Sequence, residues 1–165
     1  MDGFKNEISA GELLERYSDM VYRLAYSRTH NVHDAEDITQ DVFLKYYRTK
    51  QQFACEEHRK AWLIRVTVNT GKSLVTSAWF RHRAEPDENS ANEPFEQISE
   101  KNGLYYAVQS LPIKYRDIVH LFYYEEMSIS EICSALKLKE STVKSLLFRA
   151  RGILREKLKE EDYEL

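Results

Sequence analysis

The segment from residue 128 to residue 151 reads SISEICSALKLKESTVKSLLFRAR, and its spacing predicts the fold of the C-terminal part of the chain. It opens with a capping box, in which the Ser128 hydroxyl accepts the Glu131 backbone N–H and the Glu131 carboxylate accepts the Ser128 amide. An apolar face follows, with the small residue Cys133 at the closest approach to a second helix, and residues 137–139 form a short turn. We therefore predict a helix-turn-helix.

The second helix of this motif packs through Val143 and Leu147 and turns polar and basic residues away from them. Short polar side chains near its start can reach base edges, while lysine and arginine hold phosphates. An ordinary helical hairpin with a solvated basic face fits the same spacing. The residues that we expect at duplex DNA are Lys139, Glu140, Ser141, Thr142, Lys144, Ser145, Phe148, Arg149 and Arg151.

Helical spacing extends along most of the chain. Apolar residues recur at steps of three and four in residues 13–24, 38–46 and 63–74, and again in residues 104–111 and 118–122. No strand-like alternation of useful length occurs, and five glycines with three prolines are few for a fold with many tight turns. The predicted fold class is all-α.

The net charge of −3 conceals blocks of opposite sign. Residues 137–159 hold eight basic and two acidic side chains, which favours a nucleic-acid partner but also occurs on solvated helix faces. Residues 85–100 hold six acidic and no basic side chains, with little apolar periodicity. This stretch predicts a flexible acidic linker, residues 81–102, between two small helical domains at residues 1–80 and 103–165.

The composition excludes several classes of protein. The chain has 165 residues, which suits one ordinary domain or two small ones rather than a large enzyme. It contains no apolar run of the roughly 18 to 20 residues that a membrane-spanning helix requires, and it begins without the pattern of a secretion signal. Two cysteines are too few for a disulfide framework. We expect a cytoplasmic protein without membrane insertion of its own.

Residues 34–43 place four carboxylates beside the apolar residues Ile38, Val42 and Phe43, and an acidic face next to an apolar one is suited to docking a partner. The carboxylates lack the spacing and central glycine of a calcium loop, and a helix would point them in different directions. We therefore expect neither a metal nor a cofactor at this segment.

The third predicted helix carries a polar face opposite its apolar face. Asparagine offers a donor and an acceptor together, and flanking cations attract a nucleic-acid backbone, so this face can capture single-stranded DNA. The residues of this polar face are Arg65, Asn69, Lys72, Ser73 and Thr76.

Motifs that would indicate an enzyme or a zinc site are incomplete. Residues 70–73 read TGKS, as at the end of a phosphate-binding loop, but position 66 is valine instead of the leading glycine. The His and Cys pairs within residues 30–33 and 55–58 have zinc-like spacing, with nothing to show that they converge. No serine, cysteine or histidine lies in a nucleophile motif, so we expect no catalytic residue.

Groups of residues in the C-terminal half resemble region 4 of the bacterial sigma-70 family sigma factors, especially the extracytoplasmic-function (ECF) subgroup. In that family this helix-turn-helix reads the −35 promoter element. Two departures are Leu146, where the family commonly has arginine, and Lys137, where it usually has a turn glycine. The groups are Leu111–Pro112, Tyr115–Val119, Ser130–Ile132, Thr142–Ser145 and Arg149–Arg151.

The N-terminal half is similar to region 2 of the same family. Residues 21–26 resemble region 2.1, residues 34–43 resemble region 2.2, and Trp62 to Asn69 resemble regions 2.3 and 2.4. The resemblance implies that region 2.2 binds the clamp helices of the polymerase β′ subunit and that the third helix meets the melted −10 element. The implied polymerase contacts are Asp34, Asp37, Gln40 and Asp41.

The resemblance implies that the segment between the second and third helices receives a flipped base of the −10 element. It does not specify which of the residues between 47 and 57 receive the base. Tyr47 and Phe53 in this segment fit a core position equally well. Ser73 stands where the family usually has aspartate, four residues after Asn69.

By this resemblance the chain is an ECF sigma factor, a dissociable subunit that directs RNA polymerase to the promoters of a stress- or signal-responsive regulon. Its implied partners are core RNA polymerase, through the β′ clamp helices and the β flap, promoter DNA, and an anti-sigma factor. Trp79 and Phe80 are candidates for the anti-sigma interface or for the core. The same residues also fit two other hypotheses. One is a free-standing DNA-binding regulator, and the other is an adaptor that binds a partner through its acidic helix.

Overall fold

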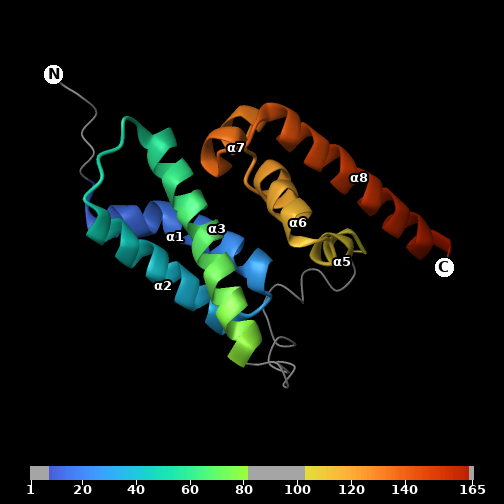
Figure 1. Ribbon diagram of the computed structural model, residues 1–165, viewed down its shortest axis with the longest axis horizontal. Coiled ribbons are helices and arrows are strands. Elements are labelled where there is room, and N and C mark those ends of the chain that lie inside the picture. The colour runs from blue at the N-terminus through green and yellow to red at the C-terminus, as the bar shows by residue number, and fades with distance from the viewer. Residues whose placement is uncertain (1–7, 82–102, 164–165) are drawn as a thin grey trace.

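The computed structural model describes the backbone of residues 8–81 and 103–163, and the side chains of residues 8–72 and 103–159. It confirms the all-α prediction, because the described residues include no strand (Figure 1). Residues 82–102 of the predicted acidic linker lie outside the described residues. The helices in chain order are α1 (Ala10–Thr29), α2 (Val32–Thr49), α3 (Glu56–Arg81), α5 (Gly103–Gln109), α6 (Ile113–Val119), the π-helix η2 (His120–Tyr124), α7 (Ile129–Leu136) and α8 (Glu140–Tyr163).

The N-terminal helices α1, α2 and α3 pack against one another. Polar caps begin the first two helices: the Ser9 hydroxyl accepts the Glu12 amide at 3.1 Å, and Asn31 Oδ1 accepts the Asp34 amide at 2.9 Å. The apolar side chains predicted from helical spacing lie between the three helices. Those with 0% exposure include Leu13, Val21, Leu24, Ile38, Val42 and Leu63.

The C-terminal helices contain the predicted helix-turn-helix. Ser128 Oγ accepts the Glu131 amide at 3.0 Å and Glu131 Oε1 accepts the Ser128 amide at 3.1 Å, so the capping box begins α7 as expected. Cys133 on α7 is half-buried against the core. A smaller second core lies where α5, α6 and α8 meet, and it consists of Ala107, Val108, Leu111, Val119, Ala150 and Leu154.

The two groups of helices also pack on each other. α3 lies against α7, and α1 lies against α6 and η2 (Figure 1). The main core therefore runs through both groups, since Val21 and Leu63 belong to the same cluster as Ile118 and Ile132. None of the described helices has the length and apolarity needed to cross a membrane.

The turn between α7 and α8 closes at Lys137, where the family usually has glycine. Lys137 has φ 56° and ψ 47°, the left-handed conformation, and its N–H donates to the Cys133 carbonyl. The turn thus keeps the tight geometry of a glycine-capped helix. A residue with a Cβ is sterically strained in this conformation.

We expect Lys137→Gly to raise the free energy of unfolding by about 0.5–1 kcal/mol, because relief of the Cβ strain outweighs the extra backbone entropy of the unfolded chain. Urea denaturation of the full chain measures this change. Ser134→Gly is the matched control, since Ser134 is exposed inside α7, and it should lower the free energy of unfolding by about 0.5 kcal/mol, the difference between the helix propensities of serine and glycine. A Lys137→Gly variant less stable than the wild type would contradict the strained cap.

Candidate polymerase and nucleic-acid interfaces

The first half of α8 presents a polar and basic surface to solvent. All nine side chains predicted at duplex DNA, from Lys139 to Arg151, are exposed. The other side of the helix is covered, because Val143, Leu147 and Ala150 are at most 2% exposed. Phe148 is 78% exposed among the polar side chains, and there it can contact a thymine methyl group. This surface has the shape and charge that an α-helix needs to enter the major groove.

Two cations of this surface have partners within the chain. Lys144 Nζ lies 2.8 Å from Glu140 Oε1, and this hydrogen bond raises the pKa of Lys144 and lowers the pKa of Glu140. An exposed pair of this kind is weak, so Lys144 can exchange Glu140 for a phosphate. Arg151 Nε donates to the Tyr123 hydroxyl at 2.6 Å, and its guanidinium lies 5.7 Å from the ring centroids of Phe122 and Tyr123. These contacts hold Arg151 beside η2.

Leu146, which departs from the family pattern, is half-buried and packs against the main core. Its role here is therefore packing, and it supplies no cation at this position. Lys144 and Arg149 remain as exposed cations on either side of it.

The four predicted polymerase contacts on α2 differ in how far they are exposed. Asp37 and Gln40 are exposed, whereas Asp34 and Asp41 are half-buried. Asp41 Oδ2 lies 3.2 Å from Lys45 Nζ, so part of its charge is balanced within the helix. Asp37 and Gln40 are accordingly the more accessible of the four predicted polymerase contacts.

An apolar groove of about 350 Å³ lies between α1 and α2, and Gln40 is the one predicted polymerase contact among the residues that line it. Leu14, Leu44 and Tyr47 line it and are 42%, 43% and 47% exposed. Phe43, which is 5% exposed, belongs to the core and also lines the groove. The sequence reading missed this groove because Leu14 and Leu44 lie just outside the apolar stripes that build the core.

The predicted strand-binding face of α3 is only partly open. Asn69 and Lys72 are exposed, but Arg65 is half-buried and its Nε donates to the Ala135 carbonyl at the end of α7 at 3.2 Å. Ser73 and Thr76 lie in the part of α3 whose side chains are outside the described residues, as do Trp79 and Phe80.

Aromatic rings order the segment between α2 and α3. Phe53 is 4% exposed and stacks on Tyr46, with 5.8 Å between ring centroids and 11° between ring planes. Trp62 meets Phe53 edge-on at 6.0 Å. Phe53 is therefore a core residue, whereas Tyr47 is exposed at the groove.

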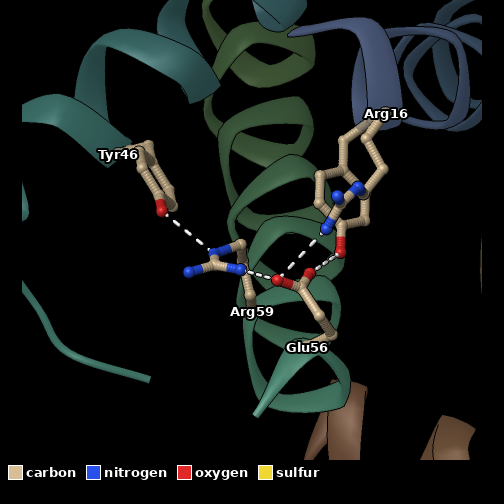
Figure 2. Close-up of polar contacts among 5 residues, drawn as sticks. Arg16, Tyr46, Glu56 and Arg59 are labelled. Atoms are coloured by element: carbon tan, nitrogen blue, oxygen red, sulfur yellow. Dashed lines mark hydrogen bonds and ion pairs between the residues drawn. The ribbon is translucent and has the colours of Figure 1, made fainter. Parts of the chain in front are cut away.

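Arg59 lies at the centre of a buried polar network that the sequence analysis did not predict. Its side chain is 0% exposed, its Nε donates to the Tyr46 hydroxyl at 3.0 Å and its Nη1 donates to Glu56 (Figure 2). Glu56 also accepts the Tyr17 hydroxyl and pairs with Arg16 at 3.2 Å. The network joins the start of α3 to α1 and α2, and the Arg59 guanidinium lies 5.6 Å from the centroid of the Phe53 ring.

Within the described ranges, no three His, Cys, Asp or Glu side chains are grouped so that they could hold a metal ion.

Two family profiles match the chain: Sigma-70 region 2 matches residues 13–81, and Sigma-70, region 4 matches residues 101–154. The RNA polymerase sigma-E factor of Streptomyces avermitilis is 30% identical over 158 residues, which cover 92% of this chain and 86% of that protein. The ECF RNA polymerase sigma factor SigW of Bacillus subtilis is 27% identical over 171 residues, covering 90% and 88%. The ECF RNA polymerase sigma factor SigE of Mycolicibacterium smegmatis is 36% identical, and the chain spans 60% of its length.

Solved structures show the same fold. The sigma factor RpoE from Bartonella quintana, in complex with the anti-sigma factor NepR, has a TM-score of 0.70 at 20% identity, over 90% of this chain and 96% of that chain. CnrH in complex with the cytosolic domain of CnrY has a TM-score of 0.68 at 22% identity, over 90% and 86%.

The chain belongs to the sigma-70 family of RNA polymerase sigma factors. Within that family it is an ECF sigma factor, which confirms the resemblance seen in its motifs.

We expect Arg59→Met to lower the free energy of unfolding by about 3–5 kcal/mol, because it leaves the partly buried Glu56 and the Tyr46 hydroxyl without their buried partner. Arg16→Met removes a second cation from the same carboxylate, but Arg16 is 46% exposed, so its effect should stay below about 1 kcal/mol. Chemical denaturation followed by circular dichroism measures both. Equal changes in the free energy of unfolding for the two substitutions would show that burial does not determine how much each arginine stabilises the protein.

Proposed function

We propose that this ECF sigma factor binds core RNA polymerase through α2, holds the melted −10 strand along α3 and reads the −35 duplex with α8. The exposed surface at the start of α8 carries the proposal: eight of its side chains, with Lys139 just before the helix, are exposed and have suitable chemistry, while Val143, Leu147 and Ala150 are buried. Family membership supports RNA polymerase as the partner. The units responsible would be residues 1–80 and 103–165.

The polymerase-binding surface in this proposal combines the acidic side of α2 with the adjoining groove. Asp37 and Gln40 offer exposed polar groups, and Leu14, Leu44 and Tyr47 offer exposed apolar area beside them. A partner helix with apolar residues in the groove and cations along its rim would match both features. Apolar contacts would supply most of the affinity, and the charges would set orientation and association rate.

The −10 function in this proposal centres on Asn69 and Lys72, whose side chains are exposed on α3. Asn69 can donate to and accept from a base edge, and Lys72 can hold the backbone phosphate. Arg65, Ser73 and Thr76 complete the proposed surface. The buried network at Arg59 supports it indirectly by fixing the start of α3.

The remaining features of the proposal follow from the class of protein. The subunit would act in the cytoplasm and contribute no catalytic residue, because the polymerase supplies the chemistry. An anti-sigma factor would hold it inactive; the sigma factor RpoE, which has a similar fold, is bound to the anti-sigma factor NepR in its solved structure. Defined new transcription starts with purified core polymerase on fragmented source DNA would test the whole proposal.

We expect Asp37→Lys to weaken binding to core polymerase at least about tenfold, because it places a cation where the partner would be cationic. Fluorescence anisotropy with labelled sigma factor measures the affinity. Glu156→Lys makes the same charge change at an exposed site on α8 and should bind core enzyme like the wild type. Unchanged binding by Asp37→Lys would show that α2 is not part of the polymerase interface, and it would favour a free-standing regulator.

We expect Lys144→Ala and Arg149→Ala each to weaken duplex binding and to reduce the slope of log affinity against log salt by about 0.9, the value for one lost phosphate contact. Lys159→Ala is the control, because Lys159 is exposed on the same helix several turns away. An adaptor that never contacts DNA would show no difference among the three variants.

A further inference from the structure

Arg151 on α8 is held by two aromatic side chains of η2. Its Nε donates to the Tyr123 hydroxyl at 2.6 Å, and its guanidinium carbon lies 5.7 Å from the ring centroids of Phe122 and Tyr123. Arg151 is exposed, and Tyr123 is 48% exposed. The pair therefore lies at the surface of the protein, where a ligand from solution can reach it.

The bond between these two side chains leaves hydrogen-bond donors on both of them. It uses the single N–H of Nε, and the Nη1 and Nη2 groups of Arg151 make no hydrogen bond within the described part of the chain. Because the Tyr123 oxygen accepts from Arg151, its own proton is left for donation to another acceptor. A cationic fork beside a hydroxyl donor suits an anion with several acceptor oxygens, such as a phosphate group.

The π-helix η2 fixes the position of Tyr123. The Glu125 N–H donates to the His120 carbonyl, five residues earlier, at 3.0 Å. Leu121 is 0% exposed, and Phe122 is half-buried against the main core. Tyr123 follows these anchored residues at the surface, so little backbone freedom remains to be lost when it binds a ligand. Short π-helical turns of this kind occur frequently at functional sites.

The position of Arg151 along α8 favours the backbone of a duplex over its base edges. Arg151 follows Ser141 by ten residues, which is about 15 Å along an α-helix. The major groove is about 12 Å wide. If the start of α8 lies at the base edges, Arg151 therefore lies beside the sugar–phosphate backbone that borders the groove. A contact there fixes the orientation of the helix and carries no sequence information.

Gly152 leaves the surface of α8 open next to Arg151. A Cβ atom at this position would meet no other atom of the described chain within 4 Å. Packing therefore does not require glycine here, although glycine is unfavourable inside a helix. Gly152 follows Ser145 and Phe148 by seven and four residues, so it shares their side of the helix. The missing side chain gives a bulky ligand room to approach the helix backbone.

We propose that the Tyr123 hydroxyl and the Arg151 guanidinium bind one phosphate of the duplex backbone beside the −35 element, and that Gly152 lets this backbone approach α8. This inference rests on the proposed −35 function of α8 and adds Tyr123 and Gly152 to its surface. Tyr123 precedes the helix-turn-helix in the chain, so its contact fixes the angle at which α8 enters the groove. The hydroxyl contributes a neutral hydrogen bond, whereas Arg151 contributes charge.

The test uses the full chain bound to core polymerase and a fluorescein-labelled duplex with the upstream element that the mapped transcription starts share. Tyr123→Phe keeps the ring and should raise the Kd about fivefold to tenfold, as expected for a lost hydrogen bond to a charged group. The slope of log affinity against log salt should not change, because a neutral hydroxyl displaces no counterion. Arg151→Met should also raise the Kd, but it should reduce this slope by about 0.9.

A second series of duplexes locates the phosphate, since each carries one neutral methylphosphonate in place of a backbone phosphate. At one shared position the replacement should weaken wild-type binding about fivefold or more, and it should weaken Tyr123→Phe and Arg151→Met less. These variants have already lost part of that contact, so the two changes are not additive.

Two further variants separate DNA contact from folding. Gly152→Leu fills the open position and should raise the Kd without lowering the free energy of unfolding, because leucine is the better helix former. Tyr106→Phe removes a hydroxyl of the same 48% exposure from α5, away from the proposed DNA surface, and should bind the duplex like the wild type. Lys144→Ala reports on the proposed −35 function independently of Tyr123.

Tyr123→Phe that binds as tightly as Tyr106→Phe would overturn the shared phosphate. A loss of affinity with the reduced salt slope of Arg151→Met would also overturn it, because Tyr123 would then only hold Arg151 in place. Wild-type affinity in Gly152→Leu would overturn the close approach to α8. If Lys144→Ala still weakens duplex binding, the proposed −35 function survives these results; if the wild type does not bind the duplex, that function fails and the phosphate site fails with it.

Discussion

The ion pair between Arg28 and Asp117 determines how the two groups of helices meet. Both side chains are nearly inaccessible to water, so neither can be solvated while α1 and α6 remain in contact. The shared core around this pair contains residues from both groups, including Leu63 and Ile132. Because isolated helices gain little stability in water, each amphipathic helix depends on such cover for its apolar face.

Buried arginines serve two different purposes in this protein. Arg59 is held by Glu56 and Tyr46 within the N-terminal group, and it makes the start of α3 rigid. Arg28 joins the two groups, but its Nε lacks a partner among the described residues. The N-terminal group is therefore internally well connected, while the contact between groups is specific in geometry and less completely satisfied.

Local patterns account for the features that the sequence predicted correctly. The capping box at Ser128, the apolar stripes and the exposed side of α8 all depend on neighbours three or four residues apart. Family motifs identified the class, and the comparisons confirmed it. The groove at Leu14 and Leu44 was missed, since it forms only when residues outside the stripes of two helices come together.

The sequence by itself determined the helices, the turn at residues 137–139, the burial of most apolar side chains and the chemistry of the α8 surface, because helix periodicity and capping are short-range effects. Only the tertiary structure showed that Arg65 is engaged by α7 and that Arg28 is buried with Asp117. These partners are 70 and 89 residues apart in the chain. No local pattern links residues so distant, and a charged side chain has the same sequence signature whether it faces water or a buried partner.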